Sequence, residues 1–328
     1  MPCKNAGNFL KECIQSIINQ NYTNWELIVC NDDSTDHSLK VLQSYSEKDE
    51  RIKVLNNVGD GIIDALNTAY NQSTGKYITR MDADDKMPPI KLKTLYELLK
   101  NTCERSLATG KVEYFPKEEI KEGFLAYELW LNKLCDDESH WKSIFKECVI
   151  PSPCWMMKRE DFDKIGGFQS YEYPEDYDLA WRMFLAGTIV QASKEILHWW
   201  RDHPERTSRT SKVYQNQTYF SLKVDYMKKM PEIKDKTWVI WGAGKKGKSL
   251  AQTLIQKGIK GFRWVCNNQN KIGRNIHGVT LESTESISEN KHKAIILICV
   301  SNIDEQNKIT QFLNSKNYQK STDYFIMV

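Results

Sequence analysis

The feature that most constrains the fold is an alternation of amphipathic and short apolar segments in the first 80 residues. Residues 8–18 carry apolar side chains at helical spacing, and residues 25–30 (WELIVC) form a short apolar run of the kind found in buried parallel strands. A second helical pattern spans 61–70, and residues 76–81 (KYITRM) predict another strand. Strands that alternate with helices predict right-handed crossovers and an open α/β sheet.

A second α/β unit is predicted near the end of the chain. Residues 236–258 give a strand, a glycine-rich turn and a helix, with Gly242, Gly244 and Gly247 in the pattern G-x-G-x-x-G. Apolar runs that follow, the clearest at 293–300, predict further strands and hence a small Rossmann-like domain. We therefore predict three parts, which are a first domain at 1–215, a helical linker at 216–235 and the Rossmann-like domain at 236–328.

Composition excludes several classes of protein. A net charge of +3 gives no reason to expect nucleic-acid binding. The nine cysteines include no C-x-x-C pair, so we expect free thiols in a reducing cytoplasm. No stretch approaches the ~18 apolar residues that span a bilayer, and the opening Met-Pro-Cys-Lys does not predict a signal peptide.

Acidic clusters follow both predicted strands of the first domain. NDDSTD (31–36) comes directly after the first strand, and MDADD (81–85) comes after the second. In open α/β sheets, ligands bind beyond the carboxyl ends of the strands. We therefore expect the two clusters to share one crevice.

Two carboxylates of MDADD suit a divalent cation. Asp82 and Asp84 are two positions apart, so their side chains point the same way in an extended segment. Such a pair fits Mg²⁺ or Mn²⁺, which would neutralise a diphosphate leaving group. The alternative is an acidic turn that caps the next helix, and spacing alone favours neither. Asp32, at the strand end, could accept hydrogen bonds from a base or a ribose. The more common interpretation of its segment is simple helix capping by Ser34, Thr35 or Asp36.

The segment PEDYD (174–178) offers a candidate general base. Asp176 stands just before a predicted helix, where a lone Asp most often acts as a cap. The functional alternative is a base that removes a proton from an acceptor hydroxyl, with Glu175 raising the pKa of Asp176 through its like charge.

Taken together and in order, these motifs resemble a known family. PCKNAGNFL, NDDSTD, RMDADD, PEDYDLAWRM and HWWRDHPERTSRT are similar to the motifs of inverting glycosyltransferases of family 2, over residues 1 to about 215. The resemblance implies a GT-A fold and transfer of a sugar from a nucleotide-sugar, most often a UDP-sugar. It implies nucleotide contacts by Pro2, Lys4, Asn5, Asp32 and Asp82.

The resemblance also implies the remaining roles. Asp84, with Asp82, would hold Mn²⁺ or Mg²⁺ on the diphosphate, and Asp176 would be the base. His203 and Arg206 belong to a basic segment, 203–206, that closes over the diphosphate in the family.

Acceptor recognition is expected from Glu175 and Trp155. For Trp155, a core position is the more common role of a tryptophan. The chain departs from the family pattern at MPCKN, where the first strand is nearly absent. Either the start is short or the sheet loses much of an element.

The glycine-rich unit leaves two interpretations open. A NAD site needs an acidic residue after the second strand, but Asn267 and Asn268 stand there, which argues against a redox cofactor. Gly242, Gly244 and Gly247 either bind a nucleotide through backbone N–H groups, or belong to a docking or dimerising module.

The sequence thus predicts a transferase for surface polysaccharide, acting in the cytoplasm, at the inner face of the membrane. Its partners would be a nucleotide-sugar and a saccharide or lipid-linked acceptor, while peripheral membrane association and a homodimer stay open. A degenerate transferase that binds nucleotide-sugars as a regulator is the main alternative. A glycosidase would also use paired carboxylates, but it leaves the D-x-D at a strand end unexplained.

Overall fold

The predicted alternation is present in the first 80 residues. The apolar run at 25–30 contains β2 (Leu27–Asn31), in which every residue is buried. The first helical pattern forms α1 (Gly7–Ile18), the second forms α3 (Gly61–Gln72), and KYITRM contains β4 (Tyr77–Thr79).

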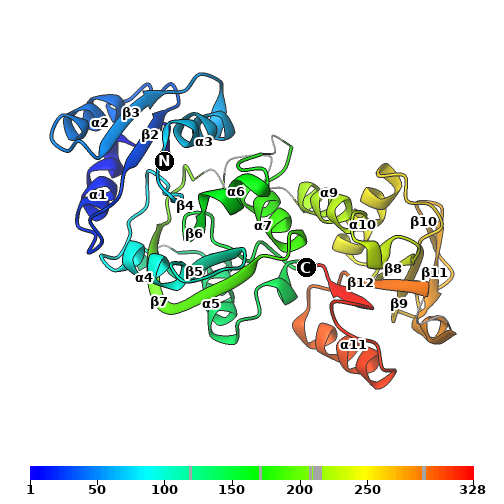
Figure 1. Ribbon diagram of the computed structural model, residues 1–328. Helices are drawn as coiled ribbons and strands as arrows, with labels where there is room; N and C mark the ends of the chain where they lie inside the picture. Colours follow the sequence, from blue (N-terminus) through cyan, green and yellow to red (C-terminus); the bar gives the residue numbers. More distant parts are fainter. Residues whose placement is uncertain (118–119, 170–171, 207–208, 210–215, 290–292) are drawn as a thin grey trace. The chain divides into compact units, whose positions relative to one another are not determined.

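The computed structural model describes residues 1–117, 120–169, 172–206, 209, 216–289 and 293–328 (Figure 1). Two compact units are present, and each is described by itself. The first comprises Met1–Trp141, Cys148–Tyr171 and Glu175–Thr210, and the second comprises Lys142–Glu147, Glu172–Pro174 and Ser211–Val328. The predicted linker region contributes α9 (Asn216–Met227) to the second unit.

Strands of the first unit form two sheets rather than the single open sheet expected. One is parallel, in the order β1 (Pro2–Cys3), β2, β3 (Ile52–Asn56). The other is mixed, in the order β4, β6 (Trp155–Lys158), β5 (Ser106–Phe115), β7 (Ile189–Arg201), with β6 antiparallel to both of its neighbours. β1 has only two residues, and both pair with β2.

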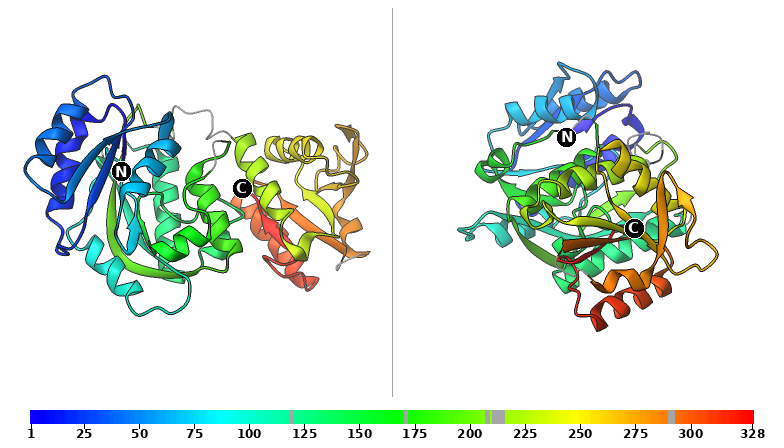
Figure 2. Two further views of the ribbon diagram at one scale, coloured as in Figure 1. Left: turned by 45° about the horizontal axis from the view of Figure 1, so that its top comes forward. Right: turned by 90° about the vertical axis from the view of Figure 1, so that its right-hand side faces the viewer.

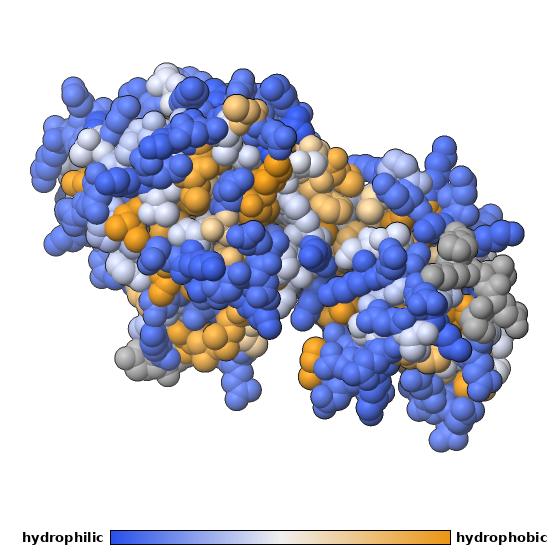
Figure 3. Space-filling view, turned by 60° about the horizontal axis from the view of Figure 1, so that its bottom comes forward, coloured by the Kyte–Doolittle hydropathy of each residue, from blue (hydrophilic) through white to orange (hydrophobic). Residues whose placement is uncertain are grey.

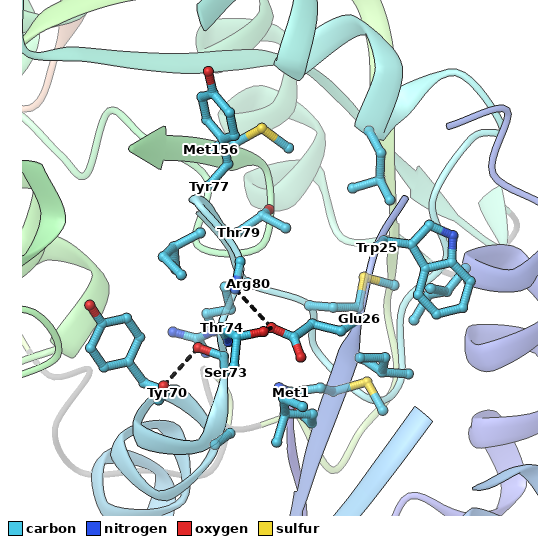
Figure 4. A pocket seen from close by; sticks show the side chains of 18 of the residues that line it. Met1, Trp25, Glu26, Tyr70, Ser73, Thr74, Tyr77, Thr79, Arg80 and Met156 are labelled. Carbon is cyan, nitrogen blue, oxygen red and sulfur yellow. Dashed lines mark hydrogen bonds between the residues drawn. The ribbon is translucent and has the colours of Figure 1, made fainter. Parts of the chain in front are cut away.

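A cavity of about 520 Å³ is lined by residues of both sheets (Figure 4). Leu27 and Ile28 of β2 line it together with Tyr77 and Thr79 of β4, and Met1 lines it as well.

Long-range pairing builds the part that the sequence left unassigned. β5 and β7 run parallel from the pair Ser106–Ile189 to the pair Phe115–Arg201, with register shifts between. This pairing carries the end of β7 toward the residues after β4. The remaining helices of this unit are α2 (Ser38–Ser46), α4 (Lys91–Leu99), α5 (Glu122–Asp137), α6 (Arg159–Lys164) and α7 (Glu175–Leu185).

The second unit is built on one six-stranded sheet (Figure 2). Its order is β10 (Asn275–Ile276), β11 (Val279–Ser283), β9 (Arg263–Cys266), β8 (Thr237–Trp241), β12 (Ala294–Ile298), β13 (Tyr324–Ile326). All neighbours are parallel except β10 and β11. The strand order reverses between β8 and β12, the place at which doubly wound sheets bind ligands. Helices α10 (Lys245–Gln256) and α11 (Ile303–Ser315) follow β8 and β12.

Hydrophilic side chains cover most of the face seen in Figure 3, with apolar side chains in scattered patches. Within the described residues, none of the helices has both the length and the apolar character needed to cross a bilayer.

The glycine-rich turn of the second unit generates a stability prediction. A Cβ on Gly247 would lie 1.8 Å from the carbonyl oxygen of Gly242, whereas a Cβ on Gly244 would meet no atom within 4 Å. We expect Gly247→Ala to lower the free energy of unfolding by about 1–3 kcal/mol through overpacking, and Gly244→Ala to change it much less. Denaturant unfolding of both variants checks this. Equal stabilities would contradict the close approach of the two glycines.

Candidate active site

Asp82 belongs to an ion-pair bridge. The buried guanidinium of Arg80 donates from Nε to Asp82 Oδ1 at 2.9 Å and from Nη1 to Glu175 Oε1 at 2.8 Å. Glu175 is the first residue of α7, so the bridge joins the segment after β4 to the start of that helix. Burial raises the pKa of Asp82, and the charge of Arg80 opposes that rise.

Asp84 faces a histidine from the end of β7. His203 Nε2 lies 2.8 Å from Asp84 Oδ2, and Arg201 Nε donates to the backbone oxygen of Asp84 at 2.6 Å. Burial acts to raise the pKa of Asp84, but the hydrogen bond to His203 and the charge of Arg206 outweigh it and hold that pKa below its ordinary value. Asp84 is therefore ionised near neutral pH.

Asp85, the third aspartate of MDADD, has a structural role. Its carboxylate is buried, with Oδ2 2.9 Å from His198 Nε2 and Oδ1 accepting from the backbone N–H of Arg201 at 2.7 Å. Lys91 Nζ lies 3.0 Å from His198 Nδ1 and 2.6 Å from the carbonyl oxygen of Pro153. An ammonium group only donates, so His198 accepts at Nδ1 and carries its proton on Nε2, toward Asp85. Burial, followed by the charges of neighbouring carboxylates, raises the pKa of Asp85 well above its ordinary value.

A divalent cation fits the Asp84–His203 pair. Carboxylate oxygen and imidazole nitrogen are both common ligands of Mn²⁺ and related metals. Within the described residues, no group of three or more His, Cys, Asp or Glu side chains is arranged to hold a metal ion. The protein would thus supply few ligands, as is usual for Mg²⁺ bound together with a substrate phosphate.

Asp32 accepts three hydrogen bonds at the end of β2. Asn57 Nδ2 donates to Oδ1 at 2.7 Å, Gly61 N–H donates to Oδ1 at 3.2 Å, and Lys4 Nζ donates to Oδ2 at 3.1 Å. Burial acts to raise the pKa of Asp32, but these hydrogen bonds outweigh it and lower that pKa. Of the residues predicted to cap the next helix, Asp36 accepts at Oδ1 from the N–H of Ser38, the first residue of α2, at 2.8 Å.

The residues before α1 contact the NDDSTD turn. Pro2 pairs with Cys30 of β2, and Asn5 Oδ1 accepts from the N–H of Thr35 at 2.8 Å. Pro2, Lys4 and Asn5 thus lie against the NDDSTD turn, as expected for neighbours in one crevice.

Helix α1 links this region to the residues around Asp84. The ring of Phe9 lies 4.8 Å from that of His203, and Glu12 Oε2 accepts from Arg201 Nη2 at 2.8 Å. Both acidic clusters also contact this helix, since Gly7 N–H donates to Asp36 Oδ2 at 3.0 Å and Cys13 Sγ lies 3.5 Å from the backbone oxygen of Asp82.

Asp176 lies beside Glu175 at the start of α7. Its Oδ1 accepts from the N–H of Tyr177 at 2.8 Å, which is a local helix-start contact. A small cavity of about 10 Å³, close to the size that holds one water, is lined by Asp176 together with Arg80, Ser152, Trp155 and Glu175. No sequence pattern pointed to Ser152, whose buried hydroxyl has no hydrogen-bond partner in the described part of the chain.

Two residues that were predicted to bind substrates, Trp155 and Arg206, are buried. Trp155 is 2% exposed and stacks on Phe162, which favours the core alternative, although it borders the cavity beside Asp176. Arg206 is buried over the rings of Trp200 and Tyr114, at 5.0 and 5.3 Å. Its charge reaches Asp84, but a moving clamp over a diphosphate stays a prediction. Part of the motif HWWRDHPERTSRT, at 207–208 and 210, falls outside the described residues.

The glycine-rich turn in the second unit stands apart from these residues in the sequence. Gly242 has φ +122° and accepts a hydrogen bond from Trp264 Nε1 at 2.9 Å. Gly244 precedes α10, whose first turn contains Gly247. Asn267 accepts from Trp241 Nε1 at 3.1 Å at the position where a NAD site needs a carboxylate. Nucleotide binding and a docking role both stay predictions.

Residues 1–166, half of the chain, match the family model described as glycosyl transferase family 2. The chain belongs to glycosyl transferase family 2. The glycosyltransferase prediction is therefore confirmed. Residues 234–321 match a second model, described as C2185-like, N-terminal.

Curated relatives include several glycosyltransferases. An uncharacterized one from Haemophilus influenzae is 29% identical over 225 residues, which cover 67% of this chain and 69% of that protein. WfgD of Escherichia coli, named a UDP-Glc:alpha-D-GlcNAc-diphosphoundecaprenol beta-1,3-glucosyltransferase, is 37% identical over 41% of this chain. The match spans 53% of WfgD and 21% of GlyA from Streptococcus pneumoniae.

Among solved structures, TarS 1–349 of S. aureus in complex with UDP-GlcNAc matches with a TM-score of 0.54. It is 15% identical, and the match covers 77% of this chain and 70% of that one. This likeness concerns the fold, and it confirms the predicted GT-A class.

The buried Lys91–His198–Asp85 chain generates a prediction. Lys91→Met would remove the ammonium group that contacts His198 and, through His198, compensates the charge of Asp85. We therefore expect the free energy of unfolding to fall by about 3–5 kcal/mol. Lys93→Met, at an exposed position of the same helix, should change it by no more than about 0.5 kcal/mol. Denaturant unfolding measures the stability of both variants. If Lys91→Met is as stable as Lys93→Met, the Lys91–His198–Asp85 contacts do not stabilise the protein.

Proposed function

We propose that this family 2 enzyme is an inverting, metal-dependent transferase that uses a UDP-sugar. The acceptor would be a hydroxyl of a saccharide or lipid-linked saccharide in surface polysaccharide synthesis. The observation that supports the proposal is the Arg80 bridge, which joins Asp82 of the D-x-D segment to Glu175, the neighbour of Asp176. Donor and acceptor groups would thus meet between the end of β4 and the start of α7.

Asp84 and His203 would hold the cation on the donor side, with Asp82 beside them. When bound, the cation supplies positive charge that stabilises the diphosphate leaving group. Lys4, Asn5 and Asp32 would contact the nucleotide, since they lie together at the ends of β1 and β2. The donor class is supported by WfgD, whose name includes UDP-Glc, and by the TarS complex with UDP-GlcNAc.

Asp176 would act on the acceptor side as the general base. Its carboxylate takes the proton of the acceptor hydroxyl while that oxygen forms a bond to the anomeric carbon. The bond from the anomeric carbon to the diphosphate oxygen breaks at the same time, and the nucleoside diphosphate leaves with the electron pair. A single displacement from the opposite face inverts the configuration.

The acceptor class is proposed from the names of relatives. WfgD acts on a GlcNAc-diphosphoundecaprenol, and TuaG of Bacillus subtilis is named a putative teichuronic acid biosynthesis glycosyltransferase. We infer a lipid-linked or polymeric saccharide acceptor, which would bring the enzyme to the cytoplasmic face of the membrane by peripheral contact.

Asp176→Asn tests the base. The substitution keeps the size and the N–H contact of the side chain but removes its proton affinity. We expect kcat to fall by about 10²–10⁴, with UDP affinity unchanged. Transfer is measured by nucleotide release and product formation with a panel of UDP-sugars and saccharide acceptors.

The matched control is Asp178→Asn, two positions further along α7. Asp178 pairs with Arg182, so its loss should reduce stability while turnover per folded molecule is retained. Equal turnover of the wild type and Asp176→Asn would contradict the assignment. UDP binding without turnover on any acceptor would instead favour a regulatory nucleotide-sugar-binding protein.

A further inference from the structure

We propose that Arg80 is a positioning residue that couples the donor and acceptor halves of the site. This inference rests on the proposed function, because it gives Arg80 a task in sugar transfer. Arg80 would hold Glu175, and through it Asp176, at a fixed place relative to Asp82.

Arg80 joins its own segment to Glu175, which lies 95 residues further along the chain. Its side chain is 6% exposed, and the two carboxylate oxygens that it contacts, on Asp82 and Glu175, lie 2.9 and 2.8 Å from its nitrogens. Arg80 also borders both the large cavity shown in Figure 4 and the small cavity beside Asp176. It therefore lies just after β4, in contact with the start of α7 and next to both cavities.

The chemistry of arginine suits this task. A guanidinium is planar, always charged, and presents five donors in a fixed fork, so it can hold two carboxylates at a set separation. Without that charge, Asp82 and Glu175 would repel each other in a buried setting. Because Glu175 directly precedes Asp176 at the start of α7, a shift of Glu175 displaces the base. Small displacements of this kind reduce transfer rates strongly.

A purely structural ion pair is the competing explanation. Removing one partner of a buried pair destabilises a protein, whereas replacing both partners by neutral groups is often tolerated. Stability alone therefore does not separate the two roles. The dependence of turnover on Glu175 does separate them, because a positioning residue that acts through Glu175 loses its effect when Glu175 is changed.

The experiment is a double-mutant cycle of the wild type, Arg80→Met, Glu175→Gln and the double variant. For each protein, kcat, the KM values of donor and acceptor, and the unfolding midpoint are measured. We expect Arg80→Met to lower kcat about 10- to 100-fold in the wild-type background and less than about 3-fold in the Glu175→Gln background. The double variant should recover the part of the stability loss that comes from an unpaired Glu175, although Asp82 still lacks its partner, and it should not recover turnover.

Arg182→Met is the matched control, since Arg182 pairs with Asp178 on the same helix. We expect it to lower the unfolding midpoint while kcat per folded molecule stays within about 3-fold of wild type. Arg80→Lys keeps the charge without the fork, and it should retain more stability than Arg80→Met but still lose turnover. If Arg80→Met does not fold, Arg80→Lys in the two Glu175 backgrounds gives the same comparison.

Additive effects of Arg80→Met and Glu175→Gln on kcat would overturn the proposal, as would full turnover in a double variant of restored stability. A wild-type protein without transfer on any donor would instead overturn the proposed function. The two failures are distinguishable because the second appears before any variant is made.

Discussion

The site depends on the separation of like charges after β4. Asp82, Asp84 and Asp85 stand within four positions, and burying such groups is costly unless each is compensated. The protein gives each carboxylate a different partner, which is Arg80 for Asp82, His203 for Asp84, and His198 for Asp85. Asp84 is thus ionised beside the imidazole of His203. Asp85, bound to His198, has a structural role.

The partners come from distant segments, so the charge arrangement also fixes the fold around the site. His198 and His203 lie in or directly after β7, and backbone N–H groups of Lys86 and Trp199 donate to each other's carbonyl oxygens to join this strand end to the segment after β4. Arg80 connects the same segment to α7. The carboxylates of a transferase site are thus held by ion pairs and hydrogen bonds between β4, β7 and α7 rather than by one local turn.

Local sequence patterns could predict some of these features and not others. The strands β2 and β4 and the helices α1 and α3 follow from apolar periodicity. The contact of Lys4 with Asp32 agrees with the grouping of Lys4, Asn5 and Asp32 that the family resemblance implies. The pairing of β5 with β7 was not predictable, because it joins residues about eighty positions apart and carries irregular register. The same holds for the anchoring role of Asp85, for the contact of Asn57 with Asp32, and for the burial of Arg206 among aromatic rings. Each of these depends on side chains that only tertiary packing brings together.

The most direct measurement is a calorimetric titration of UDP into the purified protein with and without Mn²⁺, repeated on Asp84→Ala. An exposed aspartate far along the chain, Asp136, serves as a control through Asp136→Ala. The account predicts binding that requires Mn²⁺, is lost in Asp84→Ala and is kept in Asp136→Ala. Binding of UDP that is equally strong without Mn²⁺, or unchanged in Asp84→Ala, would contradict the assignment of Asp84 to a cation and diphosphate site.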